Sequence, residues 1–140
     1  MTQKIIYINS ISVAEISQVR KFDRILGDMA FISLVSEPKK LPLVGLARCV
    51  FASKIENKSR IWETSLTAKL SESFNIGTNV YIYIIRATDG SQYIIGNGGK
   101  PYPLCNLSTT LPDNSSERVA FDLSVCFSDS FGLTRLLLAV

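Results

Sequence analysis

Alternation of apolar and polar positions recurs along this chain, and it predicts β-strands. The clearest case is residues 118–127, where the apolar positions are Val119, Phe121, Leu123, Val125 and Phe127. The positions between them carry small, polar or charged side chains. Because successive side chains of a strand point to opposite faces, this period of two predicts a strand with one buried face.

A β-hairpin is predicted in residues 80–95. Two apolar runs, Val80–Ile85 and Tyr93–Ile95, flank a short polar segment that contains Asp89-Gly90. Asp-Gly between two such runs favours a tight turn, because the turn needs residues that adopt positive φ.

Strands are also predicted over Lys4–Ile11, Ala30–Val35 and Arg48–Glu56, which are short and rich in apolar residues. Residues 60–70 admit two interpretations. Their side chains alternate as in a strand, but with Phe74 they also form a series four apart, Trp62, Leu66, Leu70 and Phe74, so that a helix over residues 60–74 is possible. The Thr and Ser content favours the strand, and the helix stays open as the alternative.

One short helix is predicted over residues 17–28. Four apolar residues recur there with helical spacing: Val19, Phe22, Ile25 and Leu26. Gly27 stands where such a helix would end.

Two further segments stand out by composition, one polar and one apolar. Asn106–Glu117 is rich in Ser, Thr and Asn, and it is predicted to be a long surface loop. The last ten residues, FGLTRLLLAV, are strongly apolar. They predict either the last strand of the core or a segment that docks on another subunit, and the sequence leaves both open.

Together these elements predict a single β-rich domain over residues 1–140. The expected fold is mainly β, an antiparallel β-sandwich or partly closed barrel with one short helix.

Composition adds an expectation of self-association. Hydrophobic residues make up 46% of the 140 residues, and charged residues make up 19%. The charged share is below the roughly 25% of an ordinary soluble domain. We therefore expect part of the apolar surface to be buried against identical subunits, the alternative being a well-packed monomer with a Ser, Thr and Asn surface.

Charge and hydropathy predict neither a nucleic-acid site nor a membrane segment. The net charge is only +3, and the Lys and Arg residues are scattered, whereas nucleic-acid binding needs a dense basic face. No apolar run approaches the roughly 18 residues of a membrane span. The N-terminal residues lack the pattern of a signal peptide, so synthesis in a cytoplasm is expected.

The residues for most catalytic mechanisms are missing. The chain has no histidine, which excludes Ser-His-Asp triads, Cys-His pairs and imidazole ligands for a metal. Its cysteines, Cys49, Cys105 and Cys126, are widely spaced and fit small buried residues better than nucleophiles. The carboxylates are spread along the chain. We expect no enzyme activity, no cofactor and no metal.

Aromatic and terminal apolar residues are the candidate contact residues. They are predicted to anchor either an interface or the core, two roles that the sequence does not separate: Trp62, Tyr81, Tyr83, Leu136, Leu137, Leu138 and Val140. Tyr93, Tyr102 and the glycine-rich segment 96–99 support an alternative, a β-sandwich binding module that recognises a glycan or a protein partner.

The order of these elements resembles that of small virion structural proteins of tailed bacteriophages and prophages, especially those that infect Bacteroidetes. The resemblance covers about residues 48–127. It rests on the segment RIWETSLTAKL at residues 60–70, on Val80–Gly96 with its Asp-Gly turn and YIIG, and on a proline near Pro101 or Pro103. A long loop and an alternating strand, Arg118–Phe127, close the pattern.

The resemblance implies a structural role. Such proteins form tail tubes, terminators or connector rings, in which β-domains pair with identical neighbours around an axis through sheet edges and loops. The expected partners are identical subunits in a ring and other virion proteins. The expected location is the virion, assembled in the cytoplasm of the bacterial host.

Overall fold

The computed structural model describes residues 3–25, 29–72, 80–96, 102–110, 120–129 and 134–139. Within these ranges the protein is mainly β, as predicted, with one 3₁₀ turn as its helical element. The strands form one large mixed sheet that does not close into a barrel, and its layers are arranged like those of a β-sandwich. None of the described residues forms a helix long and apolar enough to cross a membrane.

The strands follow one another along the chain as β1 (Gln3–Glu15), β2 (Val19–Ile25), β3 (Met29–Leu34), β4 (Lys39–Lys40), β5 (Ala47–Glu56), β6 (Ser59–Leu70), β7 (Tyr81–Ala87), β8 (Gln92–Ile95), β9 (Leu104–Thr110), β10 (Ala120–Asp129) and β11 (Thr134–Ala139). In space their order is β2-β3-β11-β8-β7-β1-β5-β6-β10-β9, and β4 pairs with β1 outside this path. The sheet is mixed because β11 runs parallel to β3, whereas the other pairs are antiparallel.

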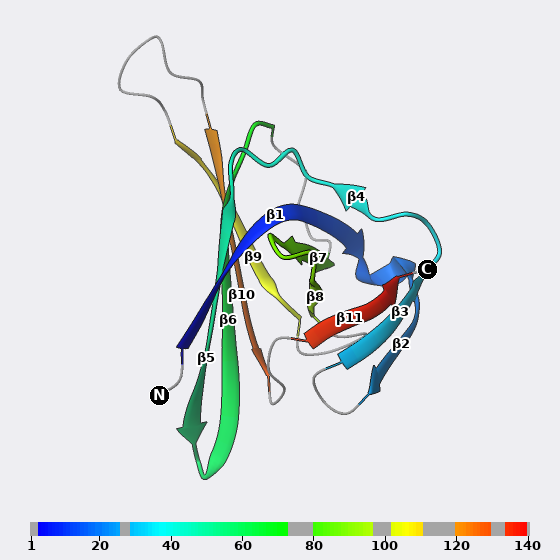
Figure 1. Cartoon of the computed structure of the whole chain (residues 1–140), viewed down its shortest axis with the longest axis vertical. Coiled ribbons are helices and arrows are strands. Elements are labelled where there is room, and N and C mark those ends of the chain that lie inside the picture. The colour runs from blue at the N-terminus through cyan, green and yellow to red at the C-terminus, as the bar shows by residue number, and fades with distance from the viewer. Residues whose placement is uncertain are drawn as a thin grey trace.

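The long, curved strand β1 joins the two halves of the sheet (Figure 1). Its residues Gln3–Ile8 pair with β5, and its residues Ile8–Glu15 pair with β7 on the opposite side. We call the first half of β1 together with β5, β6, β10 and β9 the wall. In Figure 1 the wall stands upright, and β7, β8, β11, β3 and β2 lie to its right.

The main core lies between the wall and the other layer. Leu66, Leu123 and Val125 contribute from the wall, and Tyr83 and Ile85 contribute from β7. A second cluster on the other face of β7 gathers side chains such as Ile82, Ile84, Ile32 and Leu136. Strand β7 is therefore buried on both faces, which explains why its sequence is a continuous apolar run rather than an alternating one.

The hairpin prediction is confirmed by β7 and β8. Gly90 has a φ of 93°, a value that favours glycine, and its N–H donates to the carbonyl of Ala87 at 3.0 Å. The N–H of Ser91 donates to Asp89 Oδ1 at 2.9 Å. These contacts explain why Asp-Gly is suited to this turn.

Residues 60–70 are a strand, so the preferred interpretation is confirmed and the helical alternative is wrong. They belong to β6, which pairs with β5 on one side and with β10 on the other. Leu66, Ala68 and Leu70 face the core, and the residues between them face solvent. The spacing of four arises because every second residue of a strand shares a face.

The predicted helix over residues 17–28 is wrong. Only Ile16–Gln18 form a 3₁₀ turn, and Val19–Ile25 form β2, which pairs with β3. The register shifts by one residue between Val19 and Lys21, so Val19 lies opposite Leu34 and Phe22 lies opposite Ile32. This β-bulge places Val19 and Phe22 on the same face, three residues apart, which imitates the spacing of a helix. Leu26 and Gly27 lie outside the described residues.

The loop predicted over Asn106–Glu117 is wrong in its first part. Residues up to Thr110 belong to β9, which pairs with β10 along seven positions. Its side chains alternate, with Cys105 and Leu107 packed against the core and Asn106 and Ser108 exposed. A strand with one solvent face needs few apolar residues, so its composition resembled a loop. Residues 111–117 lie outside the described ranges.

The C-terminal segment is a strand of the sheet. Thr134–Ala139 form β11, which lies between β3 and β8. Leu136 is 5% exposed and belongs to the second apolar cluster. Of the two alternatives for this segment, the structure therefore supports the core strand.

Candidate functional site

The outer face of the wall is a surface on which the sheet register arranges the side chains in rows. Paired residues of antiparallel strands share a face, so the pairs define rows across the strands. One row consists of Tyr7, Arg48, Thr67, Ser124 and Asn106. The next row consists of Ile5, Val50, Ser65, Cys126 and Leu104.

Among the strands of the wall, apolar exposure on this face is concentrated at the two edge strands. On β1, Ile5 is 43% exposed and Tyr7 is 54% exposed, and on β9, Leu104 is 74% exposed. The two middle strands, β6 and β10, present mainly small polar residues such as Ser65, Thr67, Ser124 and Ser128. Isolated exposed apolar residues are common, but their placement at both edges of one face is a pattern that calls for an explanation.

At both edges of the wall, part of the backbone pairs with none of the described strands. Within the described ranges, β9 pairs with β10 and with no other strand. Residues Gln3–Ile6 of β1 pair with β5 on one side, whereas β7 begins to pair on the other side only at Ile8. The carbonyl of Tyr7 accepts a bond from the N–H of Thr88 at 3.1 Å, so the unpaired stretch ends there.

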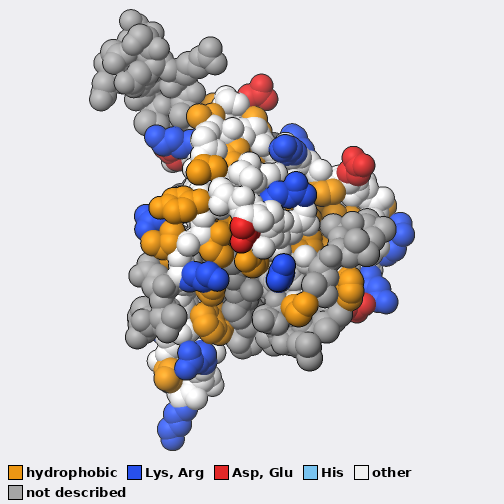
Figure 2. All heavy atoms as spheres, in the orientation of Figure 1, with side chains coloured by type: hydrophobic (Ala, Val, Ile, Leu, Met, Phe, Trp, Pro, Cys, Tyr) orange, Lys and Arg blue, Asp and Glu red, His pale blue; other side chains and the backbone are white. Residues whose placement is uncertain are grey.

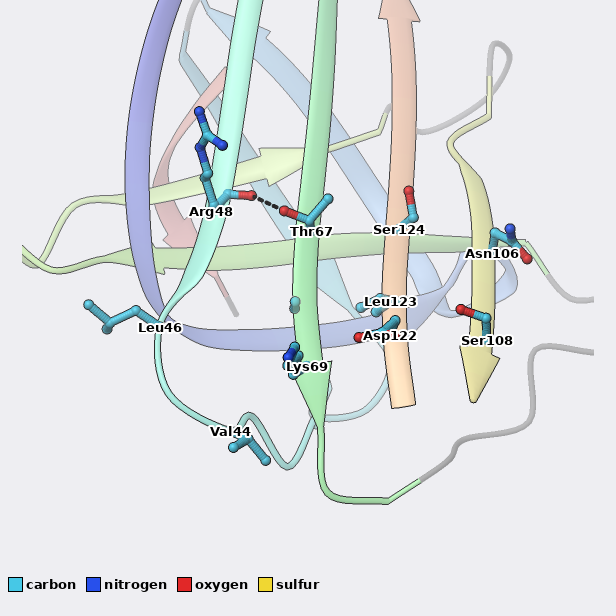
Figure 3. Close-up of a pocket in the computed structure, with 11 residues that line it drawn as sticks. Val44, Leu46, Arg48, Thr67, Lys69, Asn106, Ser108, Asp122, Leu123 and Ser124 are labelled. Carbon is cyan, nitrogen blue, oxygen red and sulfur yellow. Dashed lines mark hydrogen bonds between the residues drawn. The ribbon is translucent and has the colours of Figure 1, made fainter. Parts of the chain in front are cut away.

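A shallow hollow of about 450 Å³ lies on the outer face near β9 (Figure 3). Figure 3 shows Arg48, Thr67, Ser124 and Asn106 side by side on four neighbouring strands. Thr67 Oγ1 donates to the carbonyl of Arg48 at 3.5 Å. The next residues on the same face carry an ammonium, a carboxylate and a hydroxyl group: Lys69, Asp122 and Ser108. Val44 and Leu46 add an exposed apolar rim.

The β5–β6 hairpin projects beyond the rest of the sheet at the lower end of the wall (Figure 1). On its inner face the ring centroids of Phe51 and Trp62 lie 5.8 Å apart at an interplanar angle of 41°. Arg60 Nη1 donates to Ser53 Oγ at 3.1 Å, across the same hairpin. Ile55, near the hairpin turn, is 73% exposed. The hairpin is thus stabilised by contacts between its own two strands.

The predicted anchor residues have different positions. Tyr83 is 1% exposed and lies in the main core, and Leu136 lies in the second cluster, so both are core residues of this chain. Tyr81 and Trp62 are partly buried.

The remaining anchors are Leu137, Leu138 and Val140. The backbone of Leu137 and Leu138 belongs to β11, and their side chains lie outside what the structure describes. Val140 lies outside the described residues altogether. For none of these three does the structure separate the interface role from the core role.

Two of the three cysteines, Cys49 and Cys105, are shielded within the chain. Burial raises the pKa of the Cys49 thiol to about 12, so this thiol stays protonated at neutral pH. Burial also raises the pKa of Cys105, while a hydrogen bond with the Tyr83 side chain acts in the opposite direction. Burial raises the pKa of Tyr83 as well. Cys126 is exposed on the outer face of the wall.

No group of three or more His, Cys, Asp or Glu side chains within the described part of the chain is arranged to hold a metal ion. On the face seen in Figure 2, Lys and Arg side chains are spread out, with hydrophobic side chains between them. The outer face of the wall has hydrogen-bonding side chains, exposed apolar residues at its edges, and backbone that no described strand pairs with. Groups of these kinds can bind a ligand or another protein chain.

Sequence reasoning missed the residues at the edges of the wall. Leu104 was a lone apolar residue beside a predicted loop, and Ile5 and Tyr7 were part of an apolar run that gave no sign of which residues face outward. The alternation of Leu104, Asn106 and Ser108 with Cys105 and Leu107 was the signal that could have revealed β9.

No family model, curated protein or solved structure matches this chain.

Proposed function

We propose that this chain is a structural subunit that associates with identical copies of itself into a ring or tube. The observation that carries the proposal is the wall, whose two edges both have unpaired backbone and exposed apolar side chains on the same face. Open edges of this kind are an aggregation hazard unless another chain completes them.

Association of two different edges favours a closed ring. When one surface of a subunit binds a different surface of the next, the contact repeats, and it closes into a ring if the rotation allows. The wall has two such different surfaces, the edge formed by β1 and the edge formed by β9. Each copy in a ring would bury both.

The resemblance to tail and neck proteins of tailed phages gives this assembly a setting. We propose that the subunit belongs to a tail tube, a terminator or a connector, that its partners are identical subunits and other virion proteins, and that it acts in the virion without catalysing a reaction. Supporting this role, Cys49 and Cys105 lie in or against the main core, and Asp89 accepts a hydrogen bond in a turn.

Mass photometry and negative-stain imaging of the purified protein at micromolar concentration test this proposal. We expect particles several times heavier than the 15.5 kDa chain, and rings or short tubes in the images. Uniform particles of the mass of one chain at the highest concentration reached would contradict self-association.

The hollow on the outer face favours a second candidate, a module that binds a saccharide. Its hydroxyl, amide and charged groups donate and accept hydrogen bonds, as a ligand rich in hydroxyl groups requires. Tyr7 lies beside Arg48 in the same row and offers an apolar ring face. Of the residues first suggested for such a site, Tyr93 packs against the core and Tyr102 is 38% exposed. Residues 97–99 lie outside the described ranges.

Calorimetric titration with a set of bacterial surface oligosaccharides tests this candidate. Binding should weaken at least tenfold, equivalent to about 1.4 kcal/mol, in Arg48→Ala. Arg86→Ala, which alters an exposed arginine on β7, is the control and should bind as the parent does. Equal loss in both variants, or no binding by the parent, would remove the candidate.

A further inference from the structure

We propose that β9 of one copy pairs with residues 3–6 of β1 in the next copy, so that the wall continues from subunit to subunit. This inference rests on the proposed self-association and names the two strands that carry it. The occupant of each edge is then a second copy of this chain.

The direction of the two strands defines the kind of pairing. Each step along β1-β5-β6-β10-β9 is antiparallel, so β1 and β9 point the same way. A copy placed beside the wall in the same orientation would therefore pair its β1 with β9 in a parallel ladder. Parallel pairing is allowed in mixed sheets and already occurs in this protein between β3 and β11.

We call this pairing of β9 with β1 of the next copy the joint. The register of the wall matches outward and inward side chains across the joint. Ile5 and Leu104 belong to the same row of the outer face, so an unshifted joint brings Leu104 of one copy beside Ile5 of the next. A shift of one residue would turn the outward side chains of one strand toward the inward face of the other, so only even shifts preserve the pattern. The joint would cover Leu104 and Ile5, which are 74% and 43% exposed.

Charge also favours this pairing. Strand β9, LCNLSTT, contains neither a charged residue nor a proline, and the segment of β1 contributes one charge, Lys4. Pairing these strands brings no like charges together. Strand β2, at the other end of the sheet, carries Arg20, Lys21, Asp23 and Arg24 among its seven residues, and charged side chains of this kind discourage edge pairing.

Single substitutions at the two edges test the joint. Leu104→Lys and Ile5→Lys alter exposed side chains, so each chain should fold as the parent does. We expect each to raise the concentration needed for half-assembly at least tenfold, because a lysine at the joint loses apolar contact and solvation. Ile55→Lys is the matched control, since Ile55 is 73% exposed and Leu104 is 74% exposed, and it should assemble normally.

A charge exchange makes the test specific. The chain carrying both Ile5→Lys and Leu104→Glu should recover assembly relative to Ile5→Lys alone, because the joint then brings opposite charges together. If the parent assembles while both single lysine variants also assemble normally, the joint is wrong although self-association stands. If only Leu104→Lys fails to assemble, β9 pairs with another β9, and the proposed joint is overturned. A monomeric parent would overturn self-association and the joint together.

Discussion

The two ends of the sheet are built from different kinds of strand. Strand β2 carries four charged residues among seven, including an exposed ion pair with Lys21 Nζ 3.3 Å from Asp23 Oδ2. Strand β9 has the same length and carries no charge. Within the described residues both are terminal strands of one sheet. Each therefore presents unpaired backbone groups with which another chain could pair. Charged side chains discourage edge pairing at β2, whereas β9 has no such protection, as the proposed pairing between copies requires.

The largest effect is expected from a core residue that supports β9. Leu123 lies opposite Leu107 of β9 and is 1% exposed, so Leu123→Ala should lower the free energy of unfolding by about 2–5 kcal/mol. Leu104→Ala, on the exposed face of β9, should change it by less than about 0.5 kcal/mol. Urea denaturation of both variants measures the difference. Equal losses would mean that Leu104 packs inside the chain rather than at a free edge.

The next largest effect is expected when β2 loses three of its four charges. A chain with Arg20→Thr, Lys21→Thr and Asp23→Thr should form new assemblies or aggregates that the parent does not form, because its edge then keeps Arg24 as its single charged residue. Its monomer stability should change little, since an exposed ion pair contributes about 0–1 kcal/mol. Light scattering against concentration measures the association. No new association in this variant would show that the charges of β2 have another purpose.

A smaller effect is expected in the rates at which cysteines on the two faces of the wall react with a thiol reagent. Cys126 is exposed on the outer face, whereas Cys49 is buried on the inner face with a pKa of about 12. We expect a thiol reagent at pH 8 to modify Cys49 at least about a hundredfold more slowly than Cys126, because Cys49 reacts only after the chain opens. Mass spectrometry of digested samples over time follows each site. Comparable rates would contradict the assignment of the two faces.

The smallest effect concerns a turn that belongs to neither edge. The pKa of Asp89 is lowered, mainly by the N–H of Ser91 that donates to its carboxylate. The folded state therefore gains stability from this carboxylate above its ordinary pKa of about 3.9, and loses it as the pH falls through the lowered folded value. NMR titration of Asp89 should give a pKa below that of an unfolded peptide. In Asp89→Ala this part of the pH dependence should be missing, while assembly should be unchanged.

The sequence was sufficient for the mainly β fold and for the β7–β8 hairpin, because alternation and an Asp-Gly turn are local signals. It failed where the pattern depends on a partner strand. The β-bulge between Val19 and Lys21 became visible only from the pairing with β3, and it had produced a helical spacing.

The edges of the wall were harder still to predict. Leu104 and Ile5 share a row because three intervening strand pairings align them, and no spacing along the chain encodes that alignment. Conversely, the apolar residues near the C-terminus predicted either a core strand or a docking segment, and the pairing of β11 with β3 and β8 supports the core strand. The proposed self-association therefore uses β1 and β9.

The most direct test of the joint between copies mixes two variants that each lack one edge. Leu104→Lys retains a normal β1 and Ile5→Lys retains a normal β9, so neither should assemble alone. Native mass spectrometry of an equimolar mixture should show dimers that contain one copy of each variant and no larger assembly. A mixture that contains only monomers, or either variant forming rings by itself, would contradict the pairing of β9 with β1.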